Sequence, residues 1–162
     1  MAFDTLLHRG EIRRFLKDQK NPEKVRKELE RLYETAAPVH GVRIDEKYTI
    51  IENKLGFQIL KNSDIVWVYH LNTKAKLYGV VTTGSFHAVA LRTEDGGDHR
   101  ALTMGTNGAQ ELLQYLFPRL PQAFFGYSDE IVQVWNQGVQ KQDKHADMRM
   151  LGMMQHQKAR RG

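Results

Sequence analysis

The stretch from Val42 to Met104 limits the fold more than any other part of the chain, because it consists of short β-branched and aromatic segments separated by turn residues. Such segments are typical of strands. The connections between them can join only antiparallel neighbours, since they are too short for a crossover. The sequence therefore predicts an up-and-down meander of six strands. The strands are expected at Tyr48–Glu52, Gly56–Leu60, Ile65–Leu71, Lys76–Val81, Phe86–Thr93 and His99–Thr103.

Turns are predicted where small and polar residues interrupt these segments. Asn72-Thr73 and Thr83-Gly84 are two such sites, and residues 94–97 form a third with two glycines. Glycine supplies positive φ at little cost, so the third site is expected to be a hairpin turn rather than a cation-binding loop. The strand Ile65–Leu71 is apolar at successive positions and is expected to be central, with both faces covered.

The N-terminal third is expected to form a helical hairpin. Asn21 is a good N-cap, and Pro22 is favoured at the first helical position. Val25, Leu29 and Leu32 then recur on one helical face. Lysines and glutamates interleave on the solvated side, so neither helix is expected to offer a uniform basic face.

Helices are also expected after the strands. Thr106 or Asn107 is expected to cap the first of them. Its apolar stripe is predicted to pack on the inner face of the sheet, and it consists of Leu112, Leu113, Leu116, Phe117 and Leu120. Residues 123–127 form a short apolar segment that could add a strand, and Ser128 caps a further helix.

The chain is therefore expected to be α+β with three parts. Residues 1–37 are the N-terminal helices packed on the core, and residues 42–142 are the core with its C-terminal helices. Residues 143–162 are polar and rich in methionine, without a sustained apolar period, and are expected to be a flexible tail.

Composition narrows the function classes. The absence of cysteine excludes disulfides and cysteine-ligated metals. The first twenty residues lack the apolar run of a secretory signal, and no segment suits a membrane span, so a cytoplasmic location is expected. The net charge is +5, but charges of both signs are mixed along the chain. Nucleic-acid binders instead cluster their basic residues on one face.

The middle of the chain, from Tyr48 to Trp135, resembles the pleckstrin-homology-like fold. The resemblance rests on the strand order, on the run from Ser63 to Tyr69, and on the stretch Gly126–Glu130, which is similar to an uncharacterised bacterial group. It implies a strongly bent sheet or partial barrel capped by a helix, and a binding or assembly role. Relatives that bind phosphoinositides carry several basic residues in the first hairpin, where this chain has Lys54 alone.

Candidate catalytic groups are few. His70, His87 and His99 fall in three predicted strands and could converge, although scattered surface histidines are the simpler alternative. Ser85 is next to Gly84 in a predicted hairpin turn, which does not suit a nucleophile elbow. No cofactor or metal site is expected.

A basic patch is the best candidate for an anionic partner. It would combine Lys61, Lys74 and Lys76 with the ring of Tyr78. The alternative is that these lysines have no partner to bind and instead protect an exposed strand edge from aggregation.

The leading hypothesis is a non-catalytic binding or scaffolding module whose partner is a protein or a second copy of the chain. The alternative is a nucleic-acid-associated or anionic-ligand-binding protein, suggested by the pI of about 9.5. A third hypothesis is an enzyme that uses His70, His87 or His99.

Overall fold

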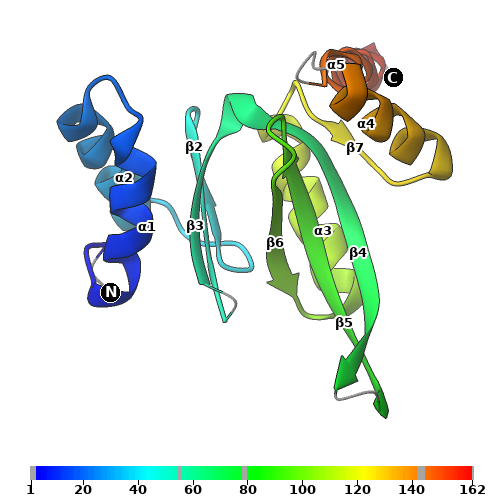
Figure 1. Ribbon diagram of the computed structural model, residues 1–162, viewed down its shortest axis with the longest axis horizontal. Helices are drawn as coiled ribbons and strands as arrows, with labels where there is room; N and C mark the ends of the chain where they lie inside the picture. Colours follow the sequence, from blue (N-terminus) through cyan, green and yellow to red (C-terminus); the bar gives the residue numbers. More distant parts are fainter. Residues whose placement is uncertain (1–2, 55, 78–79, 142–144, 162) are drawn as a thin grey trace.

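The computed structural model describes residues 3–54, 56–77, 80–141 and 145–161, and it confirms a mixed α+β fold (Figure 1). None of the helices in these ranges is long and apolar enough to cross a bilayer. In chain order the elements are α1 Leu6–Lys17, α2 Pro22–Thr35, β1 Val42–Ile44, β2 Tyr48–Asn53, β3 Gly56–Lys61, η1 Asn62–Asp64, β4 Ile65–Leu77, β5 Val80–Thr93, β6 Asp98–Thr103, α3 Gly105–Leu116, η2 Phe117–Arg119, β7 Phe124–Phe125, α4 Asp129–Lys141 and α5 Ala146–Arg161.

The prediction of one six-stranded sheet or partial barrel is wrong. The strands form two sheets, a three-stranded sheet in the order β1-β2-β3 and a four-stranded sheet in the order β6-β5-β4-β7. All neighbours are antiparallel except β7, which pairs parallel to β4. The 3₁₀ turn η1 separates the two sheets, because it ends the pairing of β3 before β4 begins.

Two predicted turns lie inside long strands. Asn72 and Thr73 pair with His87 and Phe86 in the β4–β5 ladder, so the chain does not reverse there. Thr83-Gly84 likewise lies within β5. The two strands form one long hairpin with a register shift between Lys74 and Lys76, and the ladder satisfies backbone groups that a turn would have left to solvent. The hairpin turn at residues 94–97 is confirmed, with Gly96 at φ 90°.

The N-terminal helices cover the outer face of the first sheet. Asn21 caps α2 as predicted, because its side chain accepts a hydrogen bond from Lys24 N. The helices and the sheet share a buried cluster that includes Phe3, Ile12, Leu29, Ile50 and Phe57.

A buried polar contact fixes α1 on β2. The His8 imidazole Nε2 lies 2.7 Å from Glu52 Oε2, and the Tyr33 hydroxyl donates to Glu52 Oε1 at 3.1 Å. The other ring nitrogen of His8 lies 2.8 Å from the Phe3 carbonyl oxygen. Both histidine nitrogens therefore have partners.

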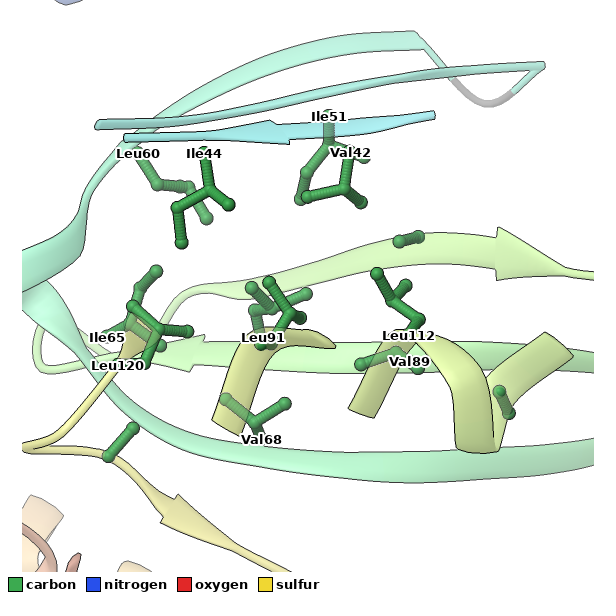
Figure 2. Close-up of a cluster of buried hydrophobic side chains, with 14 residues drawn as sticks. Val42, Ile44, Ile51, Leu60, Ile65, Val68, Val89, Leu91, Leu112 and Leu120 are labelled. Carbon is green, nitrogen blue, oxygen red and sulfur yellow. The ribbon is translucent and has the colours of Figure 1, made fainter. Parts of the chain in front are cut away.

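The main core lies between the two sheets and α3 (Figure 2). Residues of the first sheet point at residues of the second sheet and of α3; the labelled members are Val42, Ile44, Ile51, Leu60, Ile65, Val68, Val89, Leu91, Leu112 and Leu120. Leu112 and Leu116 are fully buried, as the apolar stripe predicts.

Two details of α3 differ from the prediction. Its N-cap is Met104, which has no side-chain capping bond, rather than Thr106 or Asn107. Phe117 is only partly buried, because α3 ends at Leu116 and Phe117 turns towards β7 and α5. Its ring stacks on His156 at a centroid distance of 4.1 Å.

The predicted flexible tail is wrong for residues 146–161, which form the docked helix α5. Met148 is fully buried with Trp67 and Trp135 in a third cluster. Gly152 allows the helix to approach the chain before β7 closely, since an added Cβ would lie only 2.5 Å from the Gln122 carbonyl oxygen.

Candidate functional site

A cavity of about 500 Å³ lies between the edge of β4, the end of β7 and one side of α3. Aromatic and aliphatic side chains dominate its lining, with two glutamine amides and one histidine among them. The lining residues are Tyr69, His70, Gln110, Leu113, Gln114, Phe117, Phe125, Gly126 and Tyr127. Ligand sites in proteins are commonly hollows of this size, mostly apolar, with a few polar groups.

The strand β7 forms one end of this cavity. Phe124 and Phe125 pair with Trp67 and Val68 of β4. Gly126 is then held on both sides, because its N–H donates to the Val68 carbonyl at 2.9 Å and its carbonyl accepts from Trp67 Nε1 at 2.7 Å. The φ of 132° at Gly126 is in the region that favours glycine, and the chain leaves the β4 edge at this residue.

Beyond Val68 the outer edge of β4 has no strand partner among the described residues. The Val68 carbonyl faces β7. Backbone groups of alternate residues in a strand point to the same side, so the N–H and C=O groups of His70 and Asn72 face this open edge. The backbone N–H and C=O groups of Tyr69 and Leu71 face β5 instead. The cavity therefore lies beside His70, on an edge of β4 that pairs with no other strand in the part of the chain that the structure describes.

The aromatic side chains that line the cavity also pack against other rings. Phe117 packs edge-to-face on Phe125 at 5.2 Å and stacks on His156 of α5. Tyr127 lies over Trp67 and Tyr69 at centroid distances of 5.9 and 5.1 Å. Tyr127 is nevertheless 60% exposed, so one wall of the cavity remains open to a partner.

His70 and His87 form a pair at the cavity. His70 Nε2 lies 2.9 Å from His87 Nδ1, so one ring donates a hydrogen bond to the other. Burial lowers the pKa of His70, and the positive charge that His87 can carry lowers it further. The lowered pKa favours the neutral imidazole, so His70 offers the cavity a polar group whose charged form is disfavoured.

The structure brings together two of the three predicted histidines. His99 lies elsewhere, with its Nδ1 2.6 Å from the amide oxygen of Gln58. No group of three or more histidine, cysteine, aspartate or glutamate side chains suited to a metal occurs in the described parts of the chain. Ser85 lies within β5 opposite Lys74, and not in a turn.

The predicted basic patch is spread along the hairpin. Lys61 is the last residue of β3 and pairs with Tyr48. Lys74 and Lys76 lie near the far end of β4, nine or more residues beyond its start at Ile65, which corresponds to about 30 Å of strand. Tyr78 lies outside the described residues. The structure therefore does not gather Lys61 with the other lysines.

The cavity itself was not predicted from the sequence. Its residues come from β4, α3 and the segment after α3, and they meet because β7 pairs in parallel with a strand 57 residues earlier in the chain. The one signal available was the apolar segment 123–127, for which an added strand was one possibility.

This α+β arrangement, with its cavity at an open strand edge, falls within a recognised family. The chain belongs to the family described as "Domain of unknown function (DUF6709)", whose model matches residues 7–135. The match includes every residue that lines the cavity, whereas α5 lies beyond it. No curated protein and no solved structure matches the chain.

Proposed function

We propose that this chain is a non-catalytic binding module and that it binds a partner protein as an extended segment along the open edge of β4. The observation that carries this proposal is that the cavity is lined by His70, which lies on the stretch of the β4 edge that no described strand covers. The backbone groups of Asn72 face the same edge two residues further on. In strand addition, backbone hydrogen bonds supply affinity, and pockets for alternate side chains supply specificity. The edge and the cavity together match these two requirements.

The lining favours an aromatic or large aliphatic side chain in the cavity. Leu113, Phe117 and Phe125 supply apolar surface, and Gln110 and Gln114 supply donors and acceptors at the rim. A buried aromatic side chain of the partner would remove most of this surface from water, at roughly 25 cal/mol for each Å² buried. The amides would orient its backbone or a polar tip.

The histidine pair supports binding rather than catalysis. A general base needs a partner that orients it, most often a carboxylate. His70 instead faces a second histidine, whose charge would oppose its protonation. We infer that His70 serves as a polar part of the binding surface.

We further propose that the core is a variant of the pleckstrin-homology-like fold and that the protein is cytoplasmic. Two successive antiparallel meanders followed by a helix that packs between them support the fold proposal. The parallel strand β7 and the helix α5 depart from that pattern. The lack of cysteine is compatible with a reducing compartment.

A proline substitution on the open edge tests strand addition. Peptides that bind the folded protein would be selected from a displayed random library, and their affinity measured by fluorescence anisotropy. Asn72→Pro removes a backbone N–H that faces the open edge and leaves the β4–β5 ladder intact, because proline is tolerated on that side of an edge strand. Binding should weaken by at least about tenfold, the cost of roughly one good hydrogen bond.

Two matched variants control for the side chain and for folding. Asn72→Ala keeps the N–H and should bind as the wild type does. Leu71→Pro removes an N–H that faces β5 and should unfold the hairpin, which checks the assignment of the two sides. Equal binding by a folded Asn72→Pro variant would refute strand addition at this edge.

A further inference from the structure

A second concave surface lies at the opposite end of the molecule, between α1 and α2. We call it the α1–α2 groove; it has a volume of about 1000 Å³. Five cationic side chains line it, four of them arginines: Arg9, Arg13, Arg14, Lys17 and Arg26. The groove is distinct from the cavity beside β4, because the two share no lining residue.

The cations come from both helices. Arg9, Arg13 and Lys17 recur every fourth residue and so form a row along one side of α1, about 6 Å apart along the helix axis. Arg26 of α2 contributes from the other side. The sequence-based expectation that neither helix offers a basic face missed this groove, since the cations of two helices combine only after the hairpin has folded.

Carboxylates offset only part of this charge. Asp4 lies 2.5 Å from Arg26 and 3.4 Å from Arg9, and Glu11 lies 3.4 Å from Arg14. Within the described residues, Arg13 and Lys17 are exposed and form no ion pair. The groove therefore carries a net positive charge, and the side chains of Arg13 and Lys17 are in contact with solvent.

Part of the groove lining is apolar, and α1 is held in place. Ile12, Leu16 and Pro22 are among the lining residues. Gly10 adds no side chain to the lining, and a Cβ added there would meet no atom within 4 Å. The contact between His8 and Glu52 holds α1 on the sheet, so the groove does not depend on a mobile helix.

We propose that the α1–α2 groove binds an acidic segment of a partner protein that also carries aliphatic side chains. Arginines bind carboxylates through two parallel hydrogen bonds, and the apolar lining residues would contact the aliphatic groups. Charge complementarity of this kind selects the partner and speeds its association.

The chemistry of the lining argues against other polyanions. A phospholipid surface or a nucleic-acid duplex presents charged phosphates to the cations and would leave Ile12 and Leu16 without an apolar partner. Single nucleic-acid strands are held by aromatic stacking, and none of the described lining residues is aromatic. An acidic peptide with aliphatic side chains matches both the cations and the apolar residues.

The test uses the full chain and a defined probe. The probe is a fluorescein-labelled peptide of about 12 residues, enough to follow the roughly 18 Å length of α1, rich in glutamate with leucine at helical spacing. Its affinity would be measured at low salt and at about 150 mM salt. Micromolar binding at low salt that weakens as salt rises is the expected result, and a peptide with glutamine in place of glutamate should not bind.

Charge reversal locates the site. Arg13→Glu combined with Lys17→Glu should weaken binding by at least about tenfold, because like charges then face the probe. Lys24→Glu combined with Lys27→Glu makes the same change in net charge on exposed residues of α2 outside the groove, and should have a much smaller effect.

Three results would overturn the proposal. They are no peptide binding at millimolar concentration, equal losses in the two charge-reversed variants, and tighter binding of an oligothymidylate strand or of phosphatidylserine-containing vesicles through Arg13 and Lys17. None of these results would affect the proposed strand addition at β4. That proposal is tested with other peptides and with the Asn72→Pro variant, on a different surface of the protein.

Discussion

The side-chain amide of Gln155 forms both of its hydrogen bonds with the backbone of Phe125. Phe125 N donates to Gln155 Oε1 at 2.8 Å, and Gln155 Nε2 donates to the Phe125 carbonyl at 2.7 Å. Gln155 thus takes the place of a neighbouring strand on the free edge of β7. It holds the strand whose other edge pairs with β4 and whose end forms the cavity.

Replacing this amide should loosen β7. Gln155→Leu keeps the size of the side chain but leaves two partly buried backbone groups unpaired, so it should lower the free energy of unfolding by about 1–3 kcal/mol. Gln157→Leu changes an exposed residue of the same helix and should alter it by less than about 0.5 kcal/mol. Urea denaturation measures both, and equal small changes would mean that the Gln155 bonds contribute nothing.

Helix α5 should contribute strongly to stability. Met148 is fully buried, so Met148→Ala should cost about 2–5 kcal/mol through lost burial and a cavity. Met150 is 55% exposed on the same helix, and Met150→Ala should cost much less. If the two variants melted at the same temperature, α5 would not be docked in solution.

Glycine-to-alanine substitutions in two helices should have opposite signs. Gly10→Ala enters open space in α1 and should stabilise the protein by about 0.5–1 kcal/mol, because alanine is the better helix former. Gly152→Ala places a Cβ against the backbone at Gln122 and Ala123, so α5 must shift and stability should fall. Stabilisation by both substitutions would show that α5 does not approach the chain this closely.

Stability should fall as the pH drops below 6.5, the ordinary pKa of histidine. Burial lowers the pKa of His156, and it does the same for His70 and His99. In this window the unfolded chain binds protons that the folded chain does not, so acidification favours unfolding. Above pH 6.5 both states are neutral at these sites, and no loss is expected.

His156→Gln should reduce the slope of stability against pH between about pH 6.5 and 5, since one of the shifted groups is removed. Thermal melts at intervals across this range measure the slope. Asp64 acts in the opposite direction, because burial raises its carboxyl pKa above 3.8, but its effect belongs to more acidic solution. An unchanged slope in the variant would show that His156 does not titrate differently on folding.

The sequence predicted those helix starts and hairpins that are specified by residues close together in the chain. Asn21 and Pro22 marked the start of α2, and Ser128 capped α4, where it accepts from Ile131 N. The first and last hairpins of the meander were also confirmed. In each case the residues that specify the element lie within it or directly beside it.

Long-range contacts explain what the sequence did not predict. Asn72 and Thr73 have turn propensity, yet they lie in a ladder because β5 continues opposite them. The stripe that docks α5 consists of Met148, Gly152 and His156, and only one of these counts as apolar in a periodicity search. The cavity depends on the pairing of β7 with β4, which no local pattern specifies.

The most direct test of the proposed function is hydrogen exchange of single amides along β4, measured by NMR. In the free protein the amides of His70 and Asn72 should exchange much faster than those of Tyr69 and Leu71, which face β5. Saturation with a selected peptide should protect His70 and Asn72 by at least about tenfold and leave Tyr69 and Leu71 unchanged. An Asn72 amide that is already protected in the free protein, or that stays unprotected when the peptide is bound, would contradict strand addition at this edge.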